Sequence, residues 1–172
     1  MGSEMCIRDR KNASGKVMNS VSVNAKDLQE GKKLTLVKVD KKTGEKVLIS
    51  SRTYKVSKDG TVTADTKDAG DYVLLNEKDA KALSSKILKS VALKDTKKTV
   101  ANGKKAKVTF DKNLNMENVK KITYTSSKKS VVTVNKNGAI VAKKAGKAVV
   151  KVKVTLKNGK TKTVKMTIKV TK

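Results

Sequence analysis

The stretch Val132–Val152, VTVNKNGAIVAKKAGKAVVKV, places Asn137-Gly138 and Gly146 among valines, isoleucine and lysines. Asn-Gly accepts positive φ, so it predicts a type I′ hairpin turn between two short strands. A glycine such as Gly146 commonly marks a turn or bulge where the following strand begins. The alternative is a phosphate-binding loop, but neither Gly-x-x-x-x-Gly-Lys-Ser/Thr nor a switch from strand to helix follows. The stretch therefore predicts the framework of a β-domain.

Apolar residues alternate with lysine or threonine on both sides of a second turn signal, Asn158-Gly159. The apolar positions are Val150, Val152, Val154 and Leu156 before the turn and Val164, Met166, Ile168 and Val170 after it. A period of two buries one face of each strand, so the two segments predict a long antiparallel hairpin. The opposite face carries lysine, which either stays solvated and discourages pairing with other chains or binds anions. The candidate anion-facing lysines are Lys151, Lys153, Lys165 and Lys169.

Short strands and turns also fill residues 17–76. Leu34–Val39 and Val47–Ile49 predict a hairpin, Thr53–Val56 predicts a further strand, and Asp59-Gly60 predicts another two-residue turn. The segments VSKDGTVTA, which begins at Val56, and VNKNGAIVA, which begins at Val134, share the pattern V-x-K-[DN]-G-x-[IV]-x-A. Each then reaches an Ala-Gly pair. This internal repeat indicates tandem β-domains that contain a related hairpin.

A helix is predicted between the two β-rich segments. Asn76 is a good N-cap, and Glu77 and Asp79 suit the first turn of a helix. Ala80, Leu83 and Ile87 recur at the spacing of one helix face. Residues 77–88 are therefore expected to be a short helical connector.

The predicted fold class is all-β, with two tandem small β-domains joined by this connector. Residues 11–76 form the first β-domain, whose family is uncertain and which is expected to be truncated at its start, and residues 89–172 form the second. Residues 1–10 are set aside as a non-native segment, because they hold Cys6 and two of the three arginines and resemble translated sequencing-adaptor sequence.

The composition favours diffuse attraction to polyanions. The 172 residues carry a formal net charge of +27, and lysine supplies 39 of the 42 cationic side chains. Lysine is a hydrated point charge, whereas the planar fork of arginine recognises phosphates and guanine edges. Aromatic residues make up 2 % of the chain, too few to stack on single-stranded nucleic acid.

One cysteine forms no internal disulfide, and no apolar run approaches the roughly 20 residues that span a bilayer.

No catalytic residue, cofactor or metal site is predicted. Without histidine there is no Ser/His/Asp triad and no zinc site of the usual type. Ser126-Ser127 is interpreted as strand packing and hydrogen bonding, because the usual base for a serine nucleophile is missing. The clustered acidic residues Asp59, Asp65, Asp68 and Asp71 do not follow the calcium-loop pattern and are interpreted as turn formers.

Residues 88–171 resemble the bacterial immunoglobulin-like group-two domain. The pattern comprises an aromatic residue followed by two serines, two spaced valines, a turn glycine, an alanine and a second glycine. Here these residues are Tyr124, Ser126, Ser127, Val131, Val134, Gly138, Ala142 and Gly146. The family's usual tryptophan is replaced by Tyr124. The resemblance implies a small Ig-like β-sandwich that often occurs in tandem on bacterial surface proteins as a spacer or adhesive module.

The leading hypothesis is a non-catalytic structural or adhesion module of a bacterial cell-surface or secreted protein, located outside the cell. Its candidate partners are an anionic cell-wall polymer or a host or surface polysaccharide, together with other domains of the parent protein. The alternative is a polyanion-binding protein that acts through its lysine-rich surface, with nucleic acid the less favoured ligand. A fragment of a hydrolase whose catalytic domain lies outside this chain is a third hypothesis.

Overall fold

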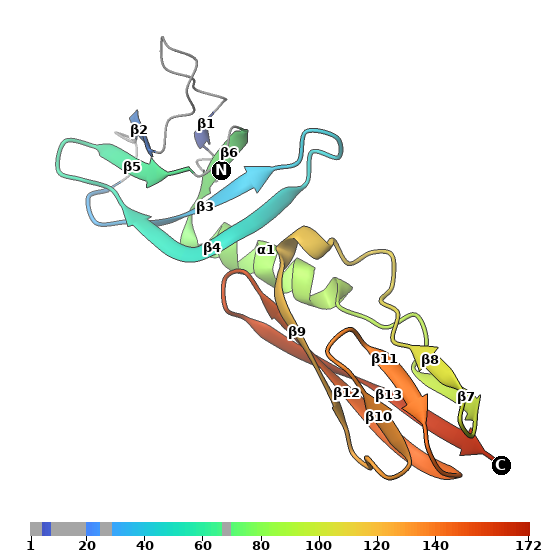
Figure 1. Cartoon of the computed structure of the whole chain (residues 1–172). Helices are drawn as coiled ribbons and strands as arrows, with labels where there is room; N and C mark the ends of the chain where they lie inside the picture. The colour runs from blue at the N-terminus through green and yellow to red at the C-terminus, as the bar shows by residue number, and fades with distance from the viewer. Residues whose placement is uncertain (1–4, 8–19, 25–28, 67–69) are drawn as a thin grey trace. The chain divides into compact units, whose positions relative to one another are not determined.

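The computed structural model describes residues 5–7, 20–24, 29–66 and 70–172 (Figure 1). The contacts divide the chain into two compact units, Met1–Ser85 and Lys86–Lys172, and each is described by itself. Strands dominate both units, and the described residues contain one α-helix, so the predicted all-β class is confirmed. The assignment of the two units as tandem domains stays a prediction.

The first unit has two antiparallel sheets in its described part. The larger sheet has the order β1-β6-β3-β4, and the smaller pairs β2 with β5. The strands are β1 (Met5–Ile7), β2 (Ser20–Asn24), β3 (Lys33–Val39), β4 (Lys46–Lys55), β5 (Thr61–Asp65) and β6 (Asp71–Leu75). The predicted hairpin is β3 with β4, but β4 continues through the segment predicted as a separate strand at Thr53. Strand β1 lies inside the segment that the sequence analysis set aside.

Aliphatic side chains and two tyrosines form the core of the first unit. They come from β3, β4, β5 and β6 and the turn after β4, and Ile49 packs against them. The buried residues of this cluster are Leu34, Leu36, Tyr54, Val56, Val62, Ala64, Tyr72 and Leu74, and Val37, Val47, Leu48, Val73 and Leu75 of the larger sheet are buried as well.

Helix α1 (Glu77–Ser90) begins where Asn76 predicts it. The amide N–H of Asp79 donates to Asn76 Oδ1 over 2.8 Å, and Asn76 Nδ2 donates to Asp79 Oδ2 over 2.8 Å. This reciprocal cap satisfies one of the amide groups that a helix N-terminus leaves without a partner. The N-cap prediction is therefore confirmed.

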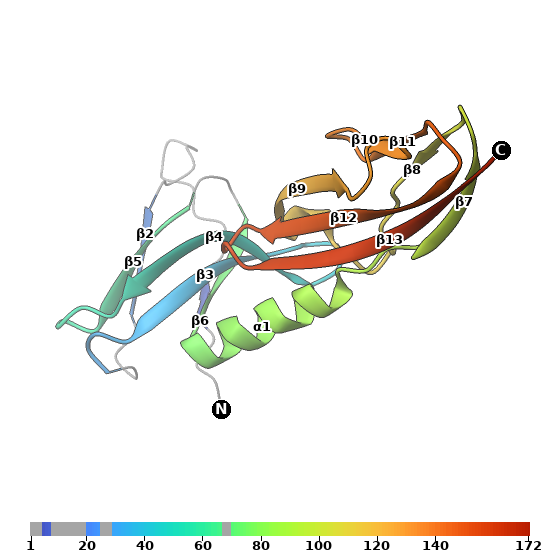
Figure 2. The same cartoon turned by 90° about the horizontal axis from the view of Figure 1, so that it is seen from below.

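The second unit stacks a mixed sheet and a smaller antiparallel sheet (Figure 2). The larger sheet has the order β7-β13-β12-β9, with β7 parallel to β13, and the smaller has the order β10-β11-β8. The strands are β7 (Lys97–Ala101), β8 (Lys105–Lys107), β9 (Val119–Ser126), β10 (Val132–Val134), β11 (Ala139–Ala142), β12 (Gly146–Leu156) and β13 (Thr161–Thr171). A single 3₁₀ turn, η1 (Met116–Asn118), precedes β9.

The predicted long hairpin is β12 with β13, paired in register from Gly146 with Val170 to Thr155 with Thr161. Every second side chain of β12 from Ala148 to Leu156 is buried. The predicted alternation is therefore confirmed. At the turn end of the hairpin, Lys162 Nζ donates to the carbonyl of Leu88 over 2.8 Å. That carbonyl, in the last turn of α1, also accepts from Val91 N–H over 3.2 Å, so the lysine cation adds a second donor at the helix C-terminus.

The turns lie where the glycines predict them, but their type differs from the prediction. Asn135 N–H donates to the carbonyl of Ala139 and Gly138 N–H to that of Asn135, each over 3.0 Å. The loop therefore has three residues, with a type I turn followed by Gly138 at φ +75°. No described residue other than glycine has positive φ, so the type I′ prediction for Asn137 and Asp59 is wrong. The closing hydrogen bonds decide the loop length, and they leave only the glycine left-handed.

The internal repeat holds for the turn and fails for the sheets around it. Ser57, Gly60 and Thr61 close the same three-residue loop through bonds of 2.9 and 3.0 Å. However, β4 and β5 on either side of that loop belong to different sheets, whereas β10 and β11 pair with each other. The larger sheets of the two units differ in strand pairing as well. In the first unit β3 lies between β4 and β6, whereas in the second unit β9 pairs directly with β12. The expectation of a related hairpin in both units is therefore wrong.

Gly138 and Gly159 occupy equivalent turns with different surroundings. Leu156 N–H donates to the carbonyl of Lys160 and Gly159 N–H to that of Leu156, and Gly159 has φ +85°. A Cβ added at Gly159 would meet nothing within 4 Å. A Cβ added at Gly138 would lie 2.9 Å from Cζ of Tyr124. A substitution at Gly159 therefore measures the strain of a left-handed backbone alone, whereas a substitution at Gly138 adds the effect of packing against Tyr124.

We expect Gly159→Ala to lower the free energy of unfolding of the second unit by about 1 kcal/mol, the strain of a left-handed residue that carries a Cβ. Gly138→Ala should lower it by about 2–4 kcal/mol, because overpacking against Tyr124 adds to the same strain. Hydrogen exchange of the β12 and β13 amides in the full chain measures both losses. In a Tyr124→Ala background the two glycine substitutions should become equal, and equal losses without that background would contradict the packing argument.

Candidate functional site

The family-signature residues of the second unit meet in three contacts that join its strands. In the first, the ring of Tyr124 on β9 covers Gly138 in the β10–β11 turn. Burial raises the pKa of the Tyr124 phenol above its ordinary value. The ring thus fixes the turn against β9.

The second contact joins the segment before β10 to the start of β12. Gly146, at φ +149°, lies under Val131, whose Cγ2 would be 3.3 Å from an added Cβ. The carbonyl of Val131 accepts a hydrogen bond from Lys143 N–H over 2.8 Å. Gly146 begins β12 as the sequence predicts.

The third contact joins the end of β9 to β12 through Ser127. Val149 N–H donates to Ser127 Oγ, and Ser127 N–H donates to the carbonyl of Val149, each over 2.9 Å. Ser126 Oγ accepts from Lys128 N–H over 3.3 Å. Both hydroxyls accept hydrogen bonds from backbone amides.

The remaining signature residues, Val134 and Ala142, lie on the paired strands β10 and β11. Ala142 is buried, its N–H donates to the carbonyl of Lys104, and its carbonyl accepts from Gly103 N–H, each over 3.0 Å. Val134 is half-buried. The signature residues therefore hold turns and strands together.

The acidic residues of the first unit stabilise turns and an ion pair. Asp59 Oδ1 accepts from Thr61 N–H over 3.0 Å and from Thr61 Oγ1 over 2.8 Å, and these bonds lower the pKa of its carboxyl. Asp71 begins β6, and Asp68 lies outside the described residues. Across the described ranges, no group of three or more acidic or cysteine side chains is placed to hold a metal ion.

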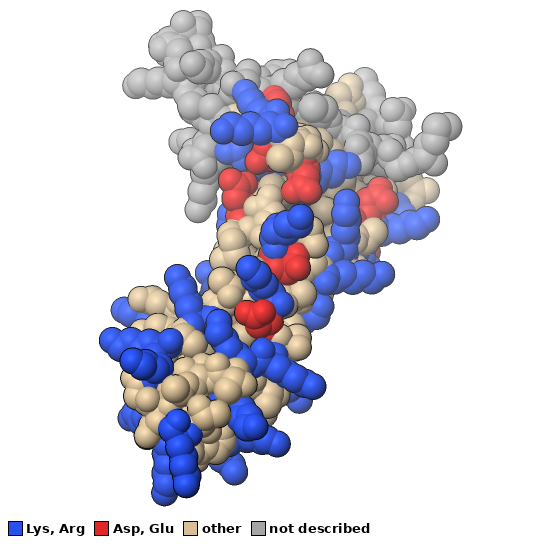
Figure 3. Space-filling view, turned by 90° about the vertical axis from the view of Figure 1, so that its right-hand side faces the viewer, with Lys and Arg blue, Asp and Glu red and all other residues tan. Residues whose placement is uncertain are grey.

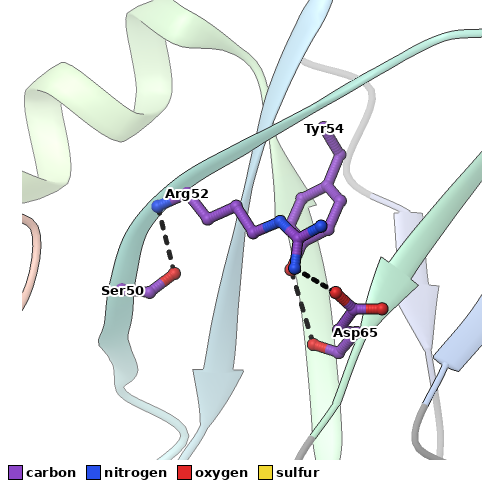
Figure 4. A network of polar contacts seen from close by, with 4 residues as sticks. All are labelled: Ser50, Arg52, Tyr54 and Asp65. Carbon is purple, nitrogen blue, oxygen red and sulfur yellow. Dashed lines mark hydrogen bonds and ion pairs between the residues drawn. The ribbon is translucent and has the colours of Figure 1, made fainter.

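Asp65 belongs to a polar network with Arg52 (Figure 4). The Arg52 guanidinium donates to Asp65 Oδ2 and lies 5.3 Å from the centroid of the Tyr54 ring. Tyr54 OH donates to the carbonyl of Asp65 over 3.5 Å, and Arg52 N–H donates to Ser50 Oγ over 3.1 Å. The network joins the strands β4 and β5, which lie in different sheets.

Positive charge is distributed unequally between the units. Residues 86–172 hold 25 lysines, no arginine and three acidic residues, a formal charge of +22, which leaves +5 for residues 1–85. In the lower part of Figure 3, where the second unit is seen, lysine side chains stand out around the surface. The second unit therefore carries most of the field that attracts anions.

The outer face of the β7-β13-β12-β9 sheet concentrates lysine and threonine, and we call it the lysine–threonine face. Strand register places on it the four predicted lysines and three more. Its lysines are Lys97, Lys121, Lys147, Lys151, Lys153, Lys165 and Lys169, and its threonines are Thr99, Thr123, Thr125, Thr155, Thr161, Thr163, Thr167 and Thr171. Val149 is half-buried on the same face, which carries no acidic and no aromatic residue.

Two pairs of lysines face each other directly across β12 and β13. Lys151 is paired with Lys165, and Lys147 is paired with Lys169. Side chains directly opposite in an antiparallel sheet are close neighbours, so like charges there repel. The second pair borders a shallow depression whose walls are Lys97, Lys98, Thr99, Lys147, Thr167 and Lys169.

Sequence reasoning missed Lys97, Lys121 and Lys147. Lys147 lies on the same face of β12 as Lys151 and Lys153. The alternation of exposed and buried positions, extended to the start of the strand at Gly146, would have identified it. Lys97 reaches the face only because β7 pairs in parallel with β13, and Lys121 only because β9 pairs with β12. These pairings join segments far apart in the chain, and no local pattern indicates them.

We expect Lys165→Glu to raise the free energy of unfolding of the second unit by about 0.5–1 kcal/mol at low salt, because repulsion of Lys151 becomes attraction. Lys165→Gln should give a smaller gain. Both gains should shrink near 1 M salt, where the screening length is about 3 Å. Lys136→Glu is the matched control, since it changes net charge equally in an exposed turn. A gain from Lys136→Glu as large as that from Lys165→Glu would contradict a pairwise origin.

The family model of the bacterial Ig-like domain (group 2) matches residues 87–171. No curated protein matches the chain. Solved structures that align with the chain include domains 4 and 5 of the S-layer protein SbsC, with a TM-score of 0.40 and 19 % identity over 99 % of this chain and 98 % of that one. Domains 1–6 of the same S-layer protein align with a TM-score of 0.37 and 15 % identity over 99 % of this chain and 35 % of that one.

The family match covers the second unit, and the resemblance noted in the sequence is confirmed. The structure adds a two-sheet β architecture in which the signature residues hold turns and strands together. Residues 87–171 of this chain therefore belong to the group 2 bacterial Ig-like domain family.

Proposed function

We propose that the chain is a non-catalytic structural module of a bacterial cell-surface or secreted protein and acts there as a spacer or as a support that presents a ligand-binding surface. The observation that carries this proposal is the Ig-like domain at residues 87–171, whose signature residues serve contacts between strands. Among the described residues, no helix is long and apolar enough to cross a membrane. An extracellular location belongs to the same proposal.

The strand order of the second unit suits a spacer that is placed under tension. Strand β7, near the start of the unit, runs parallel to β13, near its end. Tension between the two ends therefore pulls these strands in opposite directions along their axes, so that their hydrogen bonds are sheared together. Two bonds that flank the ladder are Thr167 N–H to the carbonyl of Thr96 over 2.8 Å and Asn102 N–H to that of Thr171 over 3.0 Å.

A substitution at Asn102 can remove the second of these bonds without disturbing the turn that follows β7. Lys104 N–H donates to the carbonyl of Ala101 over 3.1 Å, and Gly103 has φ +75°, which makes Asn102 the second residue of a type II turn. Proline is common at that position, but it has no N–H to donate.

We expect Asn102→Pro to lower the force at which the second unit unfolds when the full chain is pulled from its ends. Its free energy of unfolding should change by less than about 1 kcal/mol, because the lost hydrogen bond is offset by the lower entropy of the unfolded chain. Single-molecule force spectroscopy and hydrogen exchange measure the two quantities.

Asn102→Ala keeps the backbone donor and is the matched control, with an unfolding force close to that of the unaltered chain. Unfolding of the second unit at very low force, or an equal force for Asn102→Pro and the unaltered chain, would count against a spacer that resists tension.

A second function, polyanion binding, is favoured by one observation. The second unit carries a formal charge of +22, and seven of its lysines share the lysine–threonine face. A cell-wall polymer or an acidic surface polysaccharide is the partner that this charge would attract at a bacterial surface.

A further inference from the structure

The lysines of the lysine–threonine face are placed where protection of a sheet edge does not require them. Lysine on an edge strand blocks pairing with another chain. Five of the seven lysines lie on the central strands: Lys147, Lys151 and Lys153 on β12, and Lys165 and Lys169 on β13. The two directly opposed lysine pairs reduce stability. A role in solubility alone does not explain this concentration on the centre of the sheet.

The spacing of the cations favours an extended ligand. Lys147 and Lys153 lie six positions apart on β12, about 20 Å at the rise of a β-strand, with Lys151 between them. Lys165 and Lys169 accompany them on β13. A single compact anion would contact one lysine pair, whereas a linear polyanion along the β12–β13 seam would contact all five.

The kinds of side chain on the face favour phosphodiester groups. Lysine binds phosphate as a point charge, and threonine hydroxyls are common donors to phosphate oxygens. Bidentate recognition of carboxylates calls for arginine, and stacking on nucleic-acid bases calls for aromatic rings. The face has neither arginine nor an aromatic residue.

We propose that the lysine–threonine face binds a linear, flexible polymer of polyol units joined by phosphodiesters, lying along the β12–β13 seam. This rests on the proposed bacterial surface location, where a polymer of that class would be the neighbour. Lys147, Lys151, Lys165 and Lys169 supply the central cations, Lys153 extends the track beyond Lys151, and Lys97 on β7 flanks it beside Thr167. The threonines between them donate hydrogen bonds to phosphate oxygens.

The test compares two variants of the full chain that have the same net charge. The first, K147Q/K151Q/K165Q/K169Q, removes the two opposed pairs. The control, K104Q/K107Q/K112Q/K136Q, removes four exposed lysines from β8, from the turns that flank it on the sequence and from the β10–β11 turn. Binding of free poly(glycerol phosphate) is measured by calorimetry at several salt concentrations around 0.15 M.

We expect the first variant to lose affinity at least tenfold and the control to lose less than threefold. The slope of log affinity against log salt should fall by up to about four for the first variant, roughly one for each cation contact removed. Equal losses in the two variants would show attraction by net charge and overturn the proposal, as would no binding by the unaltered chain.

Two competitor polymers test the ligand class. Polygalacturonate supplies carboxylates, and single-stranded DNA supplies phosphodiesters that carry bases. Binding of either one more tightly than poly(glycerol phosphate), at equal charge concentration, would overturn the assignment to a polyol phosphate.

The unfolding force of the second unit separates this proposal from the spacer function. A chain that resists tension but does not bind the polymer would overturn the polymer proposal alone. A chain that binds the polymer through this face but unfolds at very low force would overturn the spacer function alone.

Discussion

The pairing of β12 with β13 is the interaction on which the second unit depends. The two strands form the centre of the larger sheet, and β9 and β7 attach to their outer edges. One side of the hairpin buries Val150, Val152 and Val154 together with Met166 and Ile168. Because side chains alternate with a period of two, a slip of one residue would exchange this apolar side for lysine. Burial of the core therefore fixes the position of every lysine on the opposite face.

The same register creates a conflict between the two faces of the sheet. Apolar burial on the inner face favours this pairing strongly, and the outer face carries Lys151 opposite Lys165 and Lys147 opposite Lys169. The core can tolerate that repulsion, because opposed charges on a solvated surface change stability much less than loss of a buried face. The lysine pairs are thus free to vary without loss of fold, and their presence on central strands calls for a reason outside stability.

Turn chemistry shows how far a local pattern predicts structure. Asn137-Gly138, Asp59-Gly60 and Asn158-Gly159 each mark a real turn, because glycine alone takes a left-handed backbone without strain. The two-residue turn type was wrong, since the closing hydrogen bonds enclose three residues. The common motif around Gly60 and Gly138 reproduces this loop in both units, but the strands that enter and leave it pair differently.

The sequence by itself determined the β class, the helix that begins after Asn76, the β12–β13 hairpin and the alternation that exposes Lys151, Lys153, Lys165 and Lys169. These features depend on residues close together in the chain, where periodicity and capping act directly. Only the tertiary structure decided the parallel pairing of β7 with β13, the contact of Tyr124 with Gly138 and the assembly of seven lysines on one face. Those features join segments far apart in the sequence, and they form because each segment must bury its apolar side against another.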